Sequence, residues 1–202
     1  HRLLDTGREL IEQAVPRPLH ARLLRRALRF ILPWPARFTP LLRLGQSVRP
    51  LLPTVLKRQI PARHNADAAL PLTQHTRRML LLDGCVQPAL APQINQATRR
   101  VLDALGITTV TAADSGCCGA LSQHLSATKE ARGFMRRNID AWWPSIENGA
   151  EAIVITASGC APMVKEYGRM LADDSRYADR ARRVSALARD VSEVIAAELE
   201  QQ

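Results

Sequence analysis

Three short runs of apolar and β-branched residues set the strongest constraint on how this chain can fold. They are Met79–Leu82, Ile107–Ala112 and Ala152–Ala157. Continuous runs of this length are typical of strands that are covered on both faces in a parallel sheet. Helical patterns follow each run, which gives the order strand, helix, strand, helix, strand, helix. The chain therefore predicts an α/β fold, a Rossmann-like parallel sheet with flanking helices.

The helical patterns between and after these strands have recognisable ends. We expect helices over Pro92–Leu105, Ser126–Asn148, Val164–Leu171 and Arg180–Leu199. Gly106 and Gly149 follow the first two, and glycine is favoured after a helix because it adopts a positive φ at no steric cost. Ser126 is expected to cap the second helix through its hydroxyl group.

The beginning of the chain differs in composition from the rest. The first 80 residues hold 15 Lys and Arg against 4 Asp and Glu, whereas the remainder holds 13 against 15. Nine of the thirteen prolines also lie there and divide short amphipathic helices. These helices are expected over Leu3–Val15, Leu19–Leu32, Phe38–Leu44 and Val48–Leu56, followed by a polar linker over Ile60–Thr76. We therefore expect a helical extension and linker over residues 1–75, and a cysteine-rich α/β domain over residues 76–202.

Composition and charge exclude several classes of protein. The apolar runs are far shorter than the roughly 18 residues that cross a bilayer. Aromatic residues make up only 4% and no nucleic-acid-binding motif occurs, so the net charge of +9 does not indicate a nucleic-acid partner. A basic face such as the one formed by Arg22, Arg25, Arg26 and Arg29 is usually just solvated. The alternative is contact with a partner subunit or an anionic membrane surface.

Four cysteines follow the three expected strands, and a glycine stands directly before the first cysteine of each loop. The carboxyl ends of parallel strands meet at one edge of the sheet, where ligands bind, so we expect the four sulfur atoms to converge. Four thiolates are the usual ligands of an iron–sulfur cluster, and glycines let the backbone approach it and donate N–H groups to its sulfurs. The candidate metal ligands are Cys85, Cys117, Cys118 and Cys160. The candidate cofactor-binding residues are Gly84, Gly116, Gly119 and Gly159.

The cysteines also allow two simpler interpretations. Free cysteine is often buried simply as a small apolar side chain. Structural zinc is the second possibility, although zinc sites usually bring ligands in close pairs such as C-x-x-C, which this chain lacks. Two neighbouring side chains are weaker candidates for the site: His124 for a hydrogen bond or proton relay, and Lys165 for positive charge beside an anionic cluster.

The pattern Cys85, Cys117-Cys118-Gly119 and Cys160 has 31 and 41 residues between its parts. It resembles the cysteine-rich CCG domain of the heterodisulfide reductase and glycolate oxidase iron–sulfur families. The segments LLDGCVQPALAPQINQATRRVLDALGI and RRNIDAWWPSIENGAEAIVITASGC resemble the glycolate oxidase iron–sulfur subunit family in particular, and the resemblance covers essentially the whole chain. One departure is that heterodisulfide reductases have C-x-x-C where this chain has Cys160-Ala161-Pro162-Met163. A thioether is a weaker ligand than a thiolate.

This resemblance implies an iron–sulfur electron-transfer subunit of a glycolate dehydrogenase, in which an FAD-containing subunit oxidises glycolate to glyoxylate. It implies a [4Fe–4S] cluster on the four cysteines, either complete here or completed by the second CCG half of the subunit, and no catalytic residue here. It also implies ferredoxin-type motifs and a second CCG domain elsewhere in the subunit. A cytoplasmic location is expected, with peripheral contact at the inner face of the cell membrane. The alternatives are a lactate-utilisation or heterodisulfide reductase-type protein, and a cluster-free docking scaffold for the flavin subunit.

Overall fold

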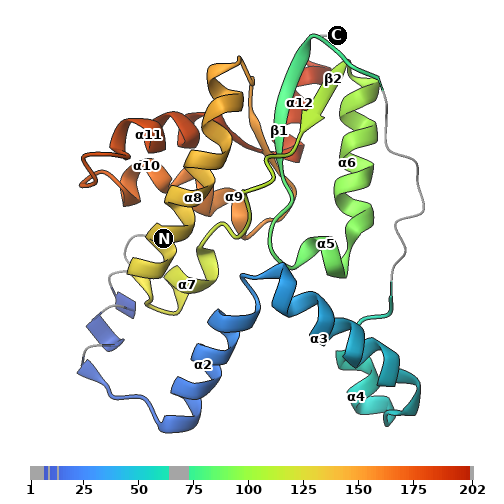
Figure 1. Cartoon of the computed structure of the whole chain (residues 1–202), viewed down its shortest axis with the longest axis vertical. Coiled ribbons are helices and arrows are strands. Elements are labelled where there is room, and N and C mark those ends of the chain that lie inside the picture. Colours follow the sequence, from blue (N-terminus) through green and yellow to red (C-terminus); the bar gives the residue numbers. More distant parts are fainter. Residues whose placement is uncertain (1–6, 9, 13, 64–72, 201–202) are drawn as a thin grey trace.

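A four-stranded parallel sheet lies between two layers of helices (Figure 1). The computed structural model describes residues 7–8, 10–12, 14–63 and 73–200. The strand order is β2-β1-β3-β4, and the bounds are β1 Arg77–Leu82, β2 Ile107–Val110, β3 Ile153–Ile155 and β4 Ala188–Asp190. The α/β fold class and the three expected strands are confirmed, and β4 is an addition.

The central strand, β1, has neighbours on both sides. Leu80 stands opposite Val110 of β2 on one side and opposite Ile153 of β3 on the other. The chain therefore moves from β1 to one side and later returns to build the other side. In open parallel sheets this reversal leaves a ligand-binding crevice at the carboxyl ends of the two strands concerned, here β1 and β3.

Alternate residues of β1 contribute to two separate cores, because successive side chains of a strand point to opposite faces. Leu80 and Leu82 belong to the larger core, which the helices of one layer complete. These are α8 (Thr128–Glu147), α9 (Cys160–Lys165), α10 (Tyr167–Met170) and α11 (Ala178–Leu187). Met79 and Leu81 belong to the smaller core, with α6 (Pro92–Ala104) and α12 (Val191–Leu199).

The expectation of one helix over Arg180–Leu199 is wrong, because β4 separates α11 from α12. Ala188 is fully buried and pairs with Ile153 at the edge of the sheet. Asp190 then begins α12 with a capping box, in which its carboxylate accepts the backbone N–H of Ser192 and the Glu193 side chain accepts that of Asp190. The Asp-x-x-Glu spacing was the sequence signal for this new helix start.

The helices around the expected cysteine loops also differ from the prediction in detail. Two short helices are added, α5 (Gln87–Leu90) and α7 (Ala120–His124). The expected helix Val164–Leu171 is divided into α9 and α10, and α9 begins at Cys160 itself. Ser126 does not cap α8: it has a φ of 60°, and its buried hydroxyl has no hydrogen-bond partner within the described residues.

The helices that precede the sheet are α2 (Leu19–Ile31), α3 (Pro35–Val48), the 3-10 turn η1 (Arg49–Leu51) and α4 (Thr54–Gln59). The expected helix Phe38–Leu44 is part of the longer α3, which continues through Pro40. Proline deprives the carbonyl four residues earlier of its partner. That carbonyl belongs to Ala36, which is exposed, so water can replace the lost bond.

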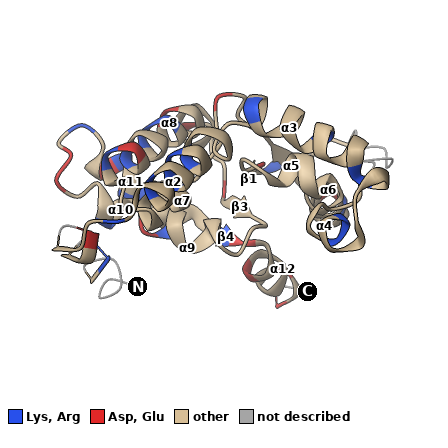
Figure 2. Ribbon diagram, turned by 90° about the horizontal axis from the view of Figure 1, so that it is seen from below, with Lys and Arg blue, Asp and Glu red and all other residues tan. Residues whose placement is uncertain are grey.

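These first helices lie across the end of the molecule where α5 and α7 follow β1 and β2 (Figure 1). None of α2, α3 and α4 contains a buried residue or an acidic one, and Figure 2 marks their basic residues in blue. Parts of the expected helix Leu3–Val15 and of the linker Ile60–Thr76 lie outside the described residues. The domain boundary at residue 75 therefore stays a prediction. Within the described chain, no helix combines the length and the apolar character needed to cross a membrane.

Candidate metal centre

The four cysteines lie in the loops that follow β1, β2 and β3, at the carboxyl edge of the sheet. The Sγ atoms of Cys118 and Cys160 are 3.1 Å apart, although 42 positions separate them in sequence. Cys117 is close enough to both Cys85 and Cys118 for each contact to shift the pKa of its thiol. The structure thus brings the four sulfur atoms into one row, from Cys85 through Cys117 and Cys118 to Cys160. We call this arrangement the cysteine row.

Mutual contact and burial favour the protonated form of three thiols in this row, those of Cys85, Cys117 and Cys118. Cys117 and Cys118 are 1% and 3% exposed. Contact with Cys118 raises the pKa of Cys117 to about 11. Contact with Cys117, together with burial, raises the pKa of Cys85 well above its usual range. Contact with Cys117 acts to lower the pKa of Cys118, but Cys160 and burial outweigh it, so this pKa is also raised. Metal binding here must therefore release protons.

The backbone around Gly119 is shaped so that it approaches sulfur closely. Its N–H donates to the Sγ of Cys117 at 3.4 Å, which is the type of contact expected of a glycine beside a cluster. Its φ is 88°, and a Cβ at this position would lie 3.0 Å from the carbonyl oxygen of Ala131. Gly84 also has a positive φ, whereas Gly159 has an ordinary φ of −79° and open space around it.

A fully buried polar pair, Asn138 of α8 and Tyr167 of α10, holds the backbone of the Cys117-Cys118 loop. Asn138 accepts the N–H of Gly116 at 2.9 Å and donates to the carbonyl of Cys117 at 3.0 Å. The hydroxyl of Tyr167 donates to the carbonyl of Cys118 at 2.8 Å and accepts from Asn138 at 3.2 Å. Burial raises the pKa of Tyr167, so it stays a neutral donor. Sequence reasoning missed this pair, although an asparagine beside Ile139 and Met135 on an apolar helix face was a usable signal.

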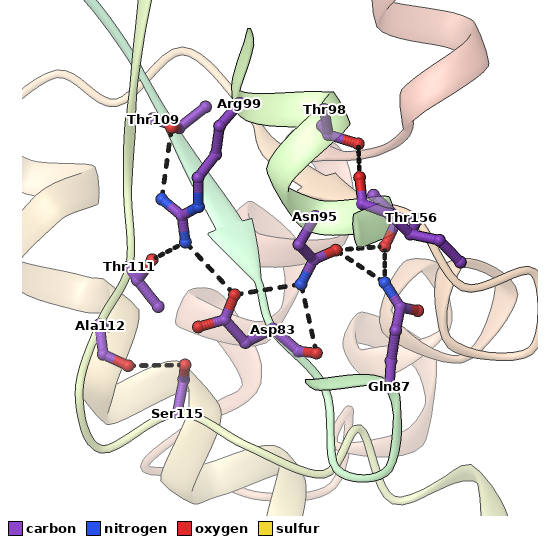
Figure 3. Close-up of polar contacts among 11 residues, drawn as sticks. Asp83, Gln87, Asn95, Thr98, Arg99, Thr109, Thr111, Ala112, Ser115 and Thr156 are labelled. Carbon is purple, nitrogen blue, oxygen red and sulfur yellow. Dashed lines mark hydrogen bonds and ion pairs between the residues drawn. The ribbon is translucent and has the colours of Figure 1, made fainter. Parts of the chain in front are cut away.

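On the α6 side of the same sheet edge, polar side chains connect the ends of β1 and β2 (Figure 3). Asp83, which directly follows β1, accepts from Asn95 at 3.1 Å and from Arg99 at 3.3 Å. Arg99 also donates to Thr111, just beyond β2, at 2.6 Å. These contacts fix the chain directly before Cys85 relative to the end of the neighbouring strand.

The same network continues to the end of β3 (Figure 3). Gln87 donates to Asn95 at 2.7 Å and to Thr156 at 2.6 Å. Asp83 and Gln87 stand two residues on either side of Cys85, and Thr156 stands four residues before Cys160. The side chains therefore form a frame that sets the spacing between the Cys85 loop and the Cys160 loop at the carboxyl edge of the sheet. We call Asp83, Gln87, Asn95, Arg99 and Thr156 the polar frame.

The two weaker candidates from the sequence have partners away from the cysteines. Lys165 donates to Glu193 at 2.5 Å, so an acidic residue already balances its charge. His124 ends α7, and its Nδ1 lies 3.1 Å from Arg8. A cation that the sequence did not single out, Arg137, lies beside the loop instead. A Cβ on Gly116 would come within 2.5 Å of its guanidinium.

The donor chemistry of the row suits an iron–sulfur cluster. In the described part of the chain, no three Cys, His, Asp or Glu side chains are arranged to hold a single metal ion. The donors that meet at the sheet edge are four thiols, and four cysteines are the usual ligands of iron–sulfur clusters. The N–H of Gly119, which points at a cysteine sulfur, fits the hydrogen bonds that tune such clusters.

An open parallel sheet with cysteines at its carboxyl edge defines a cysteine-rich α/β domain. Residues 79–165 match the family model described as "CCG: Cysteine-rich domain", and this segment is therefore a CCG domain. No solved structure matches the chain.

The curated relatives confirm the resemblance seen in the sequence. Over 195 residues the chain is 51% identical to the glycolate oxidase iron-sulfur subunit of Escherichia coli (strain K12), an alignment that covers 96% of this chain and 48% of that protein. It is 27% identical over 119 residues to the probable glycolate oxidase iron-sulfur subunit of Bacillus subtilis (strain 168), in an alignment that covers 59% of this chain and 26% of that protein. It is 30% identical over 111 residues to lactate utilization protein A of Bacillus cereus (strain B4264), in an alignment that covers 54% of this chain and 43% of that protein. The chain thus spans about half, or less, of the length of these relatives.

Proposed function

We propose that this chain is part of the iron–sulfur electron-transfer subunit of a glycolate dehydrogenase. The observation that carries the proposal is the row of four thiols at one sheet edge, with Cys118 and Cys160 3.1 Å apart. The similarity of 51% over 96% of the chain to a glycolate oxidase iron-sulfur subunit supports glycolate as the substrate of the complex. The similarity to lactate utilization protein A is weaker and covers 54% of the chain.

The cofactor in this proposal is a [4Fe–4S] cluster held by Cys85, Cys117, Cys118 and Cys160, and it supplies one-electron transfer. The chain's own residues hold the ligand loops in place. Asn138 and Tyr167 fix the backbone of Cys117 and Cys118, and Gly119 donates its N–H toward sulfur. Glycolate oxidation itself belongs to an FAD-containing partner subunit, because a flavin accepts a hydride whereas an iron–sulfur cluster transfers single electrons.

Apolar side chains exposed on α2 support contact with such a partner. Leu19, Leu24 and Phe30 are 69%, 60% and 61% exposed. We place the complex in the cytoplasm, with peripheral contact at the inner face of the membrane as a second use of the same helix. Its charged residues are all basic, and Glu12 and Glu130 balance two of them, Arg25 and Arg29. The proposal includes ferredoxin-type motifs and a second CCG domain in the same subunit, and the greater length of the relatives supports this.

Iron and acid-labile sulfide analysis of anaerobically purified protein tests the proposal. We expect the protein to contain both iron and acid-labile sulfide and to give an electron paramagnetic resonance signal that Cys117→Ser abolishes. Met163→Leu is the matched control, because it removes the thioether that stands where related proteins have a second cysteine in C-x-x-C, and it should keep the signal. Folded protein without iron would instead support a scaffold that only docks the flavin subunit.

The substrate is tested in the complex with the flavin subunit. Glycolate should reduce the cluster at a rate that lactate does not approach. A faster response to lactate would favour the lactate-utilisation alternative.

A further inference from the structure

Arg137 of α8 is a cation without an acidic partner in the described part of the chain. Its Nε atom is buried and has no hydrogen-bond acceptor. The two arginines nearest to it in this helix are paired, Arg132 with Asp173 and Arg136 with Asp174. Burying part of a charged group without an acidic partner costs free energy. The position of Arg137 therefore needs a physical explanation, whereas Arg132 and Arg136 are explained by their ion pairs.

Two aromatic rings hold the guanidinium of Arg137 in a fixed place. Its Cζ lies 5.2 Å from the centroid of Trp34 and 5.3 Å from that of Phe134. These rings are themselves in contact, with centroids 5.8 Å apart. Trp34 comes from the start of α3 and Phe134 from α8, so the extension and the CCG domain share this contact. Cation–π contacts of this kind favour arginine over other cations.

The third side of the guanidinium faces the backbone beside the cysteine row. A Cβ on Gly116 would lie 2.5 Å from Nη2 and 3.5 Å from Cζ of Arg137. Gly116 directly precedes Cys117, and its N–H is already bound by Asn138. A larger side chain at position 116 would therefore displace this guanidinium from its place.

We propose that Arg137 is a positioning residue for charge, a cation that the Trp34–Phe134 pair holds beside the cysteine row to stabilise the negative charge that the row carries. The inference rests on the proposed function, because thiolate ligands and a reduced cluster would supply that charge. A cation near a cluster favours the reduced form, which is the more negative one, and so raises the reduction potential. Trp34 makes this effect depend on the packing of the extension against α8.

Potentiometric titration of the cluster-loaded protein, followed by electron paramagnetic resonance, tests the proposal. In Arg137→Gln the midpoint should fall, so that the ratio of reduced to oxidised cluster at the wild-type midpoint drops about tenfold, about 59 mV for a one-electron couple. Arg137→Lys retains the charge, and its midpoint should lie between those of Arg137→Gln and the wild type. Arg136→Gln is the matched control one position away, where the lost charge was paired with Asp174, and its midpoint should stay at the wild-type value.

Two further variants test the contribution of the extension. Trp34→Ala should shift the midpoint in the same direction as Arg137→Gln but by less, and the midpoint of Trp34→Phe should return to the wild-type value.

A midpoint in Arg137→Gln equal to that of the wild type, or an equal shift in Arg136→Gln, would overturn the proposal. Loss of the cluster in Arg137→Gln but not in Arg137→Lys would support it, because only the former variant lacks the charge. A wild-type protein without iron would refute the proposed function, whereas an iron-loaded protein with unshifted variants refutes only the role of Arg137.

Discussion

The Sγ atoms of Cys118 and Cys160 lie 3.1 Å apart, although the two residues follow different strands of the sheet, β2 and β3. Neither strand touches the other, because β1 lies between them. The contact therefore depends on the loops that extend beyond the sheet, and on the polar groups that hold those loops.

Mild oxidation of cluster-free protein should join Cys118 to Cys160. The sulfurs are already in contact, whereas a disulfide between the adjacent Cys117 and Cys118 would strain the peptide between them. Two thiols lose their protons and two electrons to an oxidant such as diamide, and peptide mass mapping without reductant identifies the bridge. In Cys118→Ser, Cys160 should remain available to alkylation. A dominant bridge between Cys117 and Cys118 would contradict the geometry.

The convergence of the cysteines was predictable from sequence because it follows from few rules. The runs Met79–Leu82, Ile107–Ala112 and Ala152–Ala157 were sufficient to predict parallel strands, and parallel strands share one carboxyl edge. The cysteines were already placed at the ends of these runs in the sequence. Their convergence therefore needed no knowledge of side-chain packing, and their role as cluster ligands stays a prediction.

The side chains that support the row depend instead on tertiary contacts. Arg137 was one of several arginines in a helical pattern, and only the packing of Trp34 against Phe134 distinguishes it. Tyr167 comes from a helix that lies 49 positions after Cys118, the residue whose carbonyl it binds. The strand β4 is only three residues long and forms because β3 offers it an edge, which no local pattern in Ala188–Asp190 indicates.

Tyr167→Phe should destabilise the protein by about 1–3 kcal/mol, because the carbonyl of Cys118 and the amide of Asn138 lose a partner in the buried core. Urea unfolding followed by circular dichroism gives the change. Tyr177→Phe is the matched control: it removes a hydroxyl that binds Asp140, whose side chain is half exposed, and should cost about 0.5–1 kcal/mol. Equal losses in the two variants would mean that the Tyr167 contact contributes no more than an ordinary hydrogen bond.

Gly119→Ala should destabilise the protein by about 1–3 kcal/mol, since its φ of 88° is unfavourable for alanine and the new Cβ would press on the carbonyl of Ala131. Gly133→Ala is a suitable control, because this glycine lies within α8 and has open space around it. The control should stabilise by about 0.5–1 kcal/mol. The two Tm values should therefore move in opposite directions, and a rise in both would refute the close approach at Gly119.

Asn95→Ala should make Cys85 more reactive toward N-ethylmaleimide in cluster-free protein. Asn95 is 7% exposed and binds both Asp83 and Gln87, which flank Cys85, so its loss leaves buried polar groups unpaired. A loss of about 1–3 kcal/mol in the free energy that keeps the loop closed corresponds to a rate increase of about fivefold or more. Thr98→Ala, one turn further along α6, removes only a bond to the carbonyl of Ile94 and should leave the rate unchanged. An unchanged rate in Asn95→Ala would show that the polar frame does not hold the Cys85 loop.

The contribution of Glu198 to stability should depend on pH with a definite sign. The hydrogen bond from Arg77, at 2.7 Å, lowers the pKa of Glu198 below its ordinary value of 4.5. The folded state therefore favours the ionised carboxylate, so the stabilisation is present above pH 4.5 and is lost as the pH falls through the lowered pKa. Glu198→Gln should cost about 1 kcal/mol at pH 7 and less as the pH falls toward 3, measured by urea unfolding. Arg77 starts β1 and Glu198 lies near the end of α12, so this ion pair connects the helix to the sheet. If the stability difference between Glu198→Gln and the wild type stayed constant between these pH values, packing of the side chain and not its charge would account for the contribution of Glu198.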